Sequence, residues 1–289
     1  MTPTRSRNDG TVSDASTDAD ATRVRASERF DGSSSLLIDT HVHTDASYDS
    51  SASVEDVVAA AVDTGLDGIV VTDHDTTANV DAAREAAVGT DLLVIPGVEA
   101  STADGHLLGI GVTDAPPANR PLHETAAVIR AAGGVAVVPH PFQRSRHGTP
   151  SSAIRGVDGI EVWNAHTLTG IRNDQARRFA AERGYPRYGG SDAHQPEAVG
   201  AGATEVFLPE ADRDSYAGDG GSCSTAHVRR RGTDRNHSSD ATSRRAVDST
   251  TVLTAMRSGQ TRARGFDTSA RRYVRKVVHN VSIRTTSLL

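Results

Sequence analysis

Histidine and acidic side chains that could bind metal ions recur between residues 41 and 194 of this 289-residue chain. Two histidines one residue apart, His41 and His43, follow the apolar run that starts at Leu36. Residues i and i+2 of a strand point to the same face, so this spacing aims two imidazoles at one point. An H-x-H pair alone fits two ordinary histidines equally well. Its interpretation therefore depends on whether later segments carry similar groups.

Such groups do recur after later apolar runs. The candidate ligands are His41, His43, Asp49, His74, Glu99, His106, His140, Asp192 and His194. All are imidazoles or carboxylates and none is a thiol, a set that suits Zn, Mn or Fe. Nine ligands are too many for one ion. We therefore expect two or three divalent metal ions that share a bridging carboxylate.

The chemistry that this set serves best is hydrolysis of a phosphoester. Two ions about 3.5–4 Å apart hold the attacking and leaving oxygens and lower the pKa of a bridging water. The expected nucleophile is thus a metal-bridged hydroxide, and the expected catalytic residues are Glu99, Asp192 and His194. A lysine-bridged amidohydrolase is disfavoured because the only lysine is Lys276, beyond the last candidate ligand. Glu99 is the better bridge, and mononuclear amidohydrolases stay open as an alternative.

The elements that must position these side chains are strands that alternate with alanine-rich helices. Strand-like runs cover residues 36–41, 68–72, 92–96, 106–110, 135–138, 159–163, 187–190 and 203–208. Helical patterns cover 53–64, 77–88, 121–132 and 169–183, with Ser53 as a candidate N-cap. This alternation predicts a parallel sheet buried on both faces. About seven such units predict a closed or nearly closed (β/α) barrel with the polar residues at the carboxyl ends of its strands. An open doubly wound sheet is the alternative, but it would bind at one switch point.

Composition divides the chain into four parts. We expect a disordered segment at 1–34, the catalytic barrel at 35–210, a disordered low-complexity insertion at 211–249, and a helix with a basic tail at 250–289.

The formal net charge of -6 and the near absence of lysine fit a high-salt environment. The single cysteine, Cys223, excludes a disulfide within the chain. The chain has no apolar run of ~18 residues and no apolar leader, so we expect a cytoplasmic protein without a membrane partner.

The motifs in order resemble those of the PHP (polymerase and histidinol phosphatase) superfamily. They are HVHTDAS at 41–47, TDHD at 72–75, PGVE at 96–99, HLLG at 106–109, PHP at 139–141 and GSDAH at 190–194. The resemblance runs from about Leu36 to Leu208 and implies a distorted, TIM-like (β/α)7 barrel with a trinuclear site. It implies that His41, His43 and Asp192 bind one metal with Glu99 as a bridge. It further implies that Glu99, His106 and His140 bind a second, and Asp49, His74 and His194 a third.

The resemblance leaves some assignments open. In some members the acidic residue comes one position before Asp49, where this chain has Tyr48, and Asp45 is also near. Asp73 is expected to orient ligands rather than bind metal. Arg144 and Arg146, after a ligand strand, are expected to bind phosphate. Glu161 and Asn164 are candidates for a site role, whereas His123 and His166 are interpreted as ordinary surface or helix residues.

The similar small members imply a phosphorylated substrate. It would be a phosphomonoester, a nucleoside bisphosphate or a short oligonucleotide. The alternatives are a nuclease acting on single-stranded 5′ ends, a histidinol-phosphatase-like enzyme and, more remotely, a non-catalytic metal-binding regulatory domain. The oligomeric state is not predicted.

Overall fold

The structure, a computed structural model, describes residues 35–208 and 248–266. The segments predicted to be disordered, 1–34 and nearly all of 211–249, and the basic tail beyond residue 266 lie outside the described residues. Among the described helices, none is long and apolar enough to cross a membrane.

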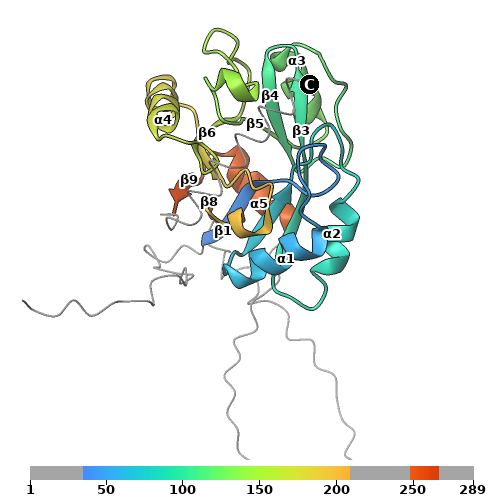
Figure 1. The fold of residues 1–289 in the computed structure, drawn as a ribbon. Helices are drawn as coiled ribbons and strands as arrows, with labels where there is room; N and C mark the ends of the chain where they lie inside the picture. Colours follow the sequence, from blue (N-terminus) through green and yellow to red (C-terminus); the bar gives the residue numbers. More distant parts are fainter. Residues whose placement is uncertain (1–34, 209–247, 267–289) are drawn as a thin grey trace, which may run out of the picture.

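One curved sheet of nine strands organises the fold (Figure 1). The strands are β1 (Ser35–Val42), β2 (Gly68–Val71), β3 (Leu93–Thr102), β4 (Gly105–Ile110), β5 (Val135–Val138), β6 (Gly159–Asn164), β7 (Arg187–Gly190), β8 (Gly202–Phe207) and β9 (Thr261–Gly265). Their order in the sheet is β7-β6-β5-β4-β3-β2-β1-β8-β9. The outermost strands, β7 and β9, contact each other, so the sheet curls into a nearly closed barrel. The predicted α/β barrel class is therefore confirmed.

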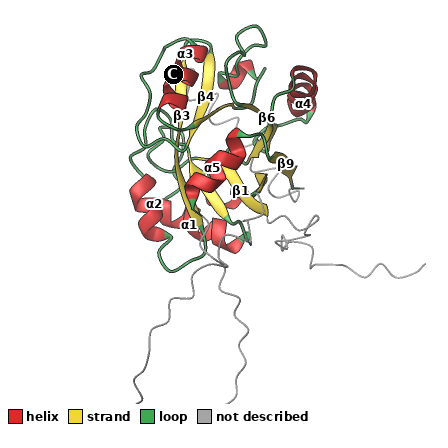
Figure 2. Ribbon diagram, turned by 180° about the vertical axis from the view of Figure 1, so that it is seen from behind, coloured by secondary structure: helices red, strands yellow, loops and turns green. Residues whose placement is uncertain are grey.

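Four of the described helices pack around the strands, and the fifth packs against the middle of the sheet (Figure 2). They are α1 (Val54–Asp63), α2 (Val80–Ala86), α3 (Leu122–Ala131), α4 (Ile171–Arg183) and α5 (Ser249–Arg257). One apolar cluster joins α1 and α2 to the outside of β1 to β3, and a second joins α3 and α4 to β4 to β6. The predicted cap of α1 is confirmed, because the Ser53 side chain accepts a hydrogen bond from the Asp56 backbone N–H.

A third apolar cluster fills the barrel and includes α5. It combines Ile38, Val137 and Tyr188 of the strands with Val252 and Met256 of α5. On β1 and β5 the residues of this cluster precede the candidate ligands, and on the antiparallel strand β4 they follow His106. Helix α5 therefore closes the barrel at the end opposite the candidate site. The Tyr188 hydroxyl fixes this plug by donating a hydrogen bond to the Met256 carbonyl, at 2.8 Å.

Strand direction differs from the prediction of a parallel sheet. Strand β4 is antiparallel to both β3 and β5, and β8 is antiparallel to β1 and β9. The physical reason at β3–β4 is the short connection, Ala103 and Asp104, because a parallel crossover needs a dozen or more residues. Strand β9 was not predicted, since its sequence TRARG lacks an apolar alternation and it pairs only at the sheet edge.

Strand β3 is longer than the sequence predicted and serves both halves of the barrel. Residues 93–96 pair with β2, and residues 97–102 pair with β4. Glu99 was expected to follow the end of a strand, but it lies inside β3 because the strand changes partners at Gly97 and continues. Glu99 therefore stands on a segment that is hydrogen-bonded on the sheet rather than on a loop.

Candidate metal centre

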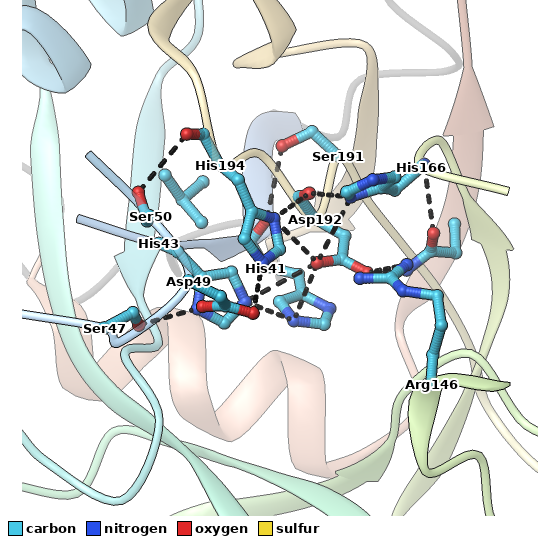
Figure 3. A network of polar contacts seen from close by, with 12 residues as sticks. His41, His43, Ser47, Asp49, Ser50, Arg146, His166, Ser191, Asp192 and His194 are labelled. Atoms are coloured by element: carbon cyan, nitrogen blue, oxygen red, sulfur yellow. Dashed lines mark hydrogen bonds and ion pairs between the residues drawn. The ribbon is translucent and has the colours of Figure 1, made fainter. Parts of the chain in front are cut away.

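The candidate ligands lie together at one end of the barrel. Figure 3 shows part of this group, with His41, His43, Asp49, Asp192 and His194. Groups of histidine and carboxylate side chains that could hold a metal ion contain all nine predicted residues and His166. Within each group the ligand atoms lie within 4.8 Å of one another. The nine residues come from β1, β3, β4 and the loops after β1, β2, β5 and β7, which places them on most of the barrel wall.

Glu99 occupies the middle of this centre. Its Oε2 lies 3.1 Å from Nε2 of both His41 and His43. Its Oε1 lies 2.9 Å from Nδ1 of His106 and from Nε2 of His140. The two carboxylate oxygens therefore face different pairs of imidazoles, as a bridging ligand requires.

Asp192 faces a second part of the centre. Its Oδ1 lies 3.5 Å from His43 Nε2 and 3.7 Å from His41 Nε2, yet it accepts no hydrogen bond. Its Oδ2 is engaged by other groups, at 2.8 Å from Asn164 Nδ2 and 2.6 Å from an Arg146 guanidinium nitrogen. The carboxylate is thus held through one oxygen and presents the other to the imidazoles.

Asp49 rather than Asp45 or Tyr48 reaches the centre. Asp49 Oδ2 lies 3.0 Å from His194 Nε2 and 3.4 Å from His74 Nε2. Asp45 is exposed and accepts a hydrogen bond from Asn79 instead. Tyr48 is 78% exposed and stacks on the His74 ring. Geometry therefore favours Asp49 among the three alternatives.

The electrostatics show that the centre attracts positive charge. Burial would raise the pKa of Glu99, but the charges of His41, His106 and His74 hold that pKa well below its usual range. Burial would likewise lower the pKa of His43, but its contacts with Asp192 and Glu99 raise it to about 9.

Several buried atoms fit the place of metal ligands. Asp49 Oδ1, Asp192 Oδ1 and His74 Nδ1 are buried without a hydrogen-bond partner. His41 Nε2 and His43 Nε2 lie 3.1 Å apart, a contact in which the two lone pairs of neutral imidazoles would face each other. Buried polar atoms are normally satisfied, so exceptions need a cause. Divalent cations among these nitrogen and oxygen atoms would supply the missing partners.

Asp73 supports the centre without facing it. Its carboxylate accepts hydrogen bonds from the Thr44 backbone N–H at 2.6 Å, the Thr44 hydroxyl at 2.6 Å and the Ser47 hydroxyl at 2.9 Å. The Ser47 oxygen in turn lies 3.0 Å from His43 Nδ1 and 3.1 Å from the His74 backbone N–H. Asp73 therefore orients the loop that carries the ligands, as a carboxylate behind a metal ligand does.

The backbone is specialised where ligands leave the strands. His140 and Asp192 both adopt positive φ angles, 29° and 54°. Such angles are uncommon for residues other than glycine and cluster at functional sites. Gly190 is required for a different reason, because a Cβ at this position would lie 2.5 Å from His41 Cβ. The sequence indicated the ligands but not these angles.

Sequence reasoning missed His166 as a member of the centre. It also treated Arg144 and Arg146 alike, although the structure places them in different surroundings. His166 is not a surface residue: it is buried, its ring centroid lies 5.0 Å from that of His194, and its Nδ1 lies 3.0 Å from the Asp192 carbonyl. Its position shortly after the end of β6 was the available signal. Arg146 pairs with Asp192, whereas Arg144 is exposed.

Parts of the chain are similar in sequence to known proteins. A family model described as PHP-associated matches residues 170–215. The 5′-3′ exoribonuclease Rnm of Salmonella typhimurium is 34% identical over 137 residues, 45% of this chain and 46% of that protein. The phosphoribosyl 1,2-cyclic phosphate 1,2-diphosphodiesterase of Eggerthella lenta is 37% identical over 89 residues, 29% of this chain and 34% of that protein. The chain thus spans less than half the length of these two relatives.

A solved structure agrees in fold. It is a two-domain protein from Bacteroides vulgatus that contains a predicted PHP-like metal-dependent phosphoesterase. It superposes with a TM-score of 0.57 and 19% identity over 86% of this chain and 71% of that chain. By this family model and this fold, the chain is similar to PHP proteins. The residues matched by the family model begin just before α4 and include Asp192 and His194.

Proposed function

We propose that this protein is a metal-dependent phosphoesterase that uses two or three divalent ions, Mn, Zn or Fe. The observation that carries the proposal is Glu99, whose two carboxylate oxygens each lie within 3.1 Å of a pair of buried imidazoles. Bound ions would activate a water molecule and neutralise the phosphate oxygens. The cluster of nitrogen and oxygen ligands without sulfur suits these three metals.

The proposed ligand sets follow the three groups of contacts. His41, His43, Asp192 and Glu99 would hold one ion, Glu99, His106 and His140 a second, and Asp49, His74 and His194 a third. Glu99, Asp192 and His194 are the proposed catalytic residues, because they would contact both the ions and the reacting phosphate. Asp73 holds the loop that bears His43.

Arg146 is the proposed contact for a substrate phosphate. One of its guanidinium nitrogens lies 2.6 Å from Asp192 Oδ2, so the group is held at the edge of the centre. A guanidinium carries five N–H donors, and those not directed at Asp192 can bind phosphate oxygens. Arg144, exposed on the same short helix (Arg144–Arg146), would contact a second phosphate or a longer substrate.

One relative favours a nucleotide substrate, because it is named a 5′-3′ exoribonuclease. Another is named a phosphoribosyl 1,2-cyclic phosphate 1,2-diphosphodiesterase and favours a phosphoester more generally. We therefore propose a nucleoside bisphosphate or a short 5′-phosphorylated oligonucleotide as the substrate class. A nuclease acting on single-stranded 5′ ends is the second candidate, favoured by the exoribonuclease relative. Histidinol phosphate is the third.

The test compares phosphate release by the wild type and Glu99→Gln with added Mn(II) at high salt. The substrates are a nucleoside 3′,5′-bisphosphate, a 5′-phosphorylated oligonucleotide and histidinol phosphate. Glu124→Gln, which affects only an exposed pair with Arg120, is the matched control. We expect turnover of a nucleotide substrate by the wild type and the control, and its loss in Glu99→Gln with unchanged circular dichroism. Bound metal without turnover of any substrate would contradict the proposal and favour a regulatory domain.

A further inference from the structure

Glu161 of β6 is a buried carboxylate that belongs to none of the metal-capable groups. Its Oε1 lies 3.1 Å from His41 Nδ1. Its Oε2 accepts hydrogen bonds from the His140 backbone N–H at 2.8 Å and from Asn164 Nδ2 at 2.9 Å. The Glu161 side chain thus contacts two proposed metal ligands, His41 on β1 and His140 after β5.

Asn164 extends this connection to a third ligand. Its Nδ2 donates to Asp192 Oδ2 at 2.8 Å as well as to Glu161. Its Oδ1 accepts from the His166 backbone N–H at 3.0 Å, and this contact fixes the orientation of the amide. Glu161 and Asn164 together therefore link His41, His140 and Asp192, which stand on or follow β1, β5 and β7.

The contact with His41 determines which ring nitrogen carries a proton. A carboxylate accepts hydrogen bonds only, so His41 Nδ1 must be the donor to Glu161. In the neutral ring, Nε2 then carries the lone pair. That atom lies 3.1 Å from Glu99 Oε2, where a metal ion would bind. The partner of the second ring nitrogen is what fixes the tautomer of a metal-binding histidine.

We propose that Glu161, together with Asn164, is the positioning residue that sets the metal affinity of this centre. Glu161 keeps His41 in the tautomer that can bind a cation and holds the His140 backbone, while Asn164 holds Asp192. The inference rests on the proposed function, because it concerns the same metal centre. It adds a role for β6, a strand that contributes none of the nine proposed ligands.

The isosteric change Glu161→Gln tests this role sharply. A glutamine has one acceptor oxygen in place of two. If that oxygen faces His41, the NH₂ group meets two donors, the His140 N–H and Asn164 Nδ2. If the NH₂ group faces His41 instead, Nδ1 must accept and the proton moves to Nε2. Asn164 cannot relieve the first conflict by turning its amide, because its oxygen is held by His166.

The experiment measures Mn(II) and Zn(II) binding by chelator competition for the wild type, Glu161→Gln and Asn164→Ala. Glu205→Gln is the matched control on β8, where the half-buried side chain pairs with Arg264, away from the metal centre. We expect Glu161→Gln to weaken metal binding about 10- to 100-fold, with kcat reduced more than KM is raised. The control should bind metal as the wild type does.

A second readout separates positioning from a general loss of structure. Long-range ¹H–¹⁵N spectra of the metal-free protein, recorded at a pH at which the His41 ring is neutral, report its tautomer. We expect an Nδ1-protonated ring in the wild type and in Asn164→Ala, and a shift toward Nε2 protonation in Glu161→Gln. Asn164→Ala should still weaken metal binding, because Asp192 loses a donor.

Two outcomes would overturn the inference. One is metal affinity within twofold of the wild type in Glu161→Gln, and the other is an unchanged His41 tautomer in that variant. If Glu161→Gln does not fold, Asn164→Ala decides, and metal affinity equal to that of the wild type would reject the role. Failure of the proposed function is distinguishable, since it would show as absent phosphate release in a wild type that binds metal normally.

Discussion

The replacement Asp73→Asn should destabilise the metal-free protein by about 2 kcal/mol, the value of one hydrogen bond to a charged group. An asparagine keeps the shape but only one acceptor oxygen. That oxygen can retain the Thr44 N–H and the Ser47 hydroxyl, so the new NH₂ group faces the Thr44 hydroxyl. The hydroxyl already accepts a hydrogen bond from Asn79 at 2.9 Å. Buried among donors, the amide loses the interaction that the carboxylate made there.

The assay is thermal unfolding followed by circular dichroism with a chelator present. A loss of about 2 kcal/mol in a domain of this size corresponds to a fall in Tm of about 4–8 °C. Asp91→Asn, at an exposed position, is the control and should shift Tm by less than about 1 °C, as surface changes generally do. Metal affinity should fall as well, because Ser47 orients His43. A Tm for Asp73→Asn equal to that of Asp91→Asn would refute the reasoning.

Three further predictions follow from other parts of the molecule. Removal of divalent ions with a chelator should lower Tm, since a ligand at 100 times its Kd stabilises the folded state by about 2.7 kcal/mol; identical melting curves with and without Mn(II) would contradict metal binding. Gly190→Ala should destabilise the protein by about 1–3 kcal/mol through overpacking against His41 and should weaken metal binding, as measured by unfolding and chelator competition; unchanged values in both would show that β1 and β7 yield easily. Tyr188→Phe should lower stability by about 1 kcal/mol through loss of the bond to Met256, with phosphate release unchanged; reduced phosphate release would mean that the α5 plug influences the opposite end of the barrel.

The candidate ligands could be found from the sequence because nearly all of them follow or end an apolar run, and His106 begins one. In a barrel whose strands share an end, such residues converge whatever the details of the loops. His41 and His43 illustrate this, since their spacing of two places both on one face of β1. The same reasoning identified α1 from Ser53, because a capping side chain is a local signal.

The sequence named Glu161 and Asn164 as candidates for a site role, but it could not show which ligands they contact. Glu161 and Trp163 lie two residues apart on β6, but the pairing with β7 shifts between them. Such a bulge re-aims side chains, so alternation along the strand does not tell which residue faces the centre. His166 was missed because it lies beyond the strand, where only the three-dimensional path of the loop brings it to Asp192.

Strand direction was the other limit. An apolar run carries no information on whether its neighbour is parallel, and here β4 and β8 run against the expected direction. The two-residue connection before Gly105 was the signal that could have shown this for β4. For β8 the partner, β1, is more than 150 residues away in the chain, so no local pattern reports the pairing.

The left-handed backbone at His140 and Asp192 bears on how the centre would select its ions. Each such conformation costs on the order of 1 kcal/mol and persists only where the surrounding structure enforces it. The folded chain has thus arranged these donors before any ion arrives, and uptake requires little movement of the loops. If the donors are arranged in advance, discrimination between metal ions depends on how readily each ion exchanges its bound water for imidazole. Under the proposed function, magnesium, which sheds water reluctantly and prefers oxygen, would bind less readily here than manganese, iron or zinc.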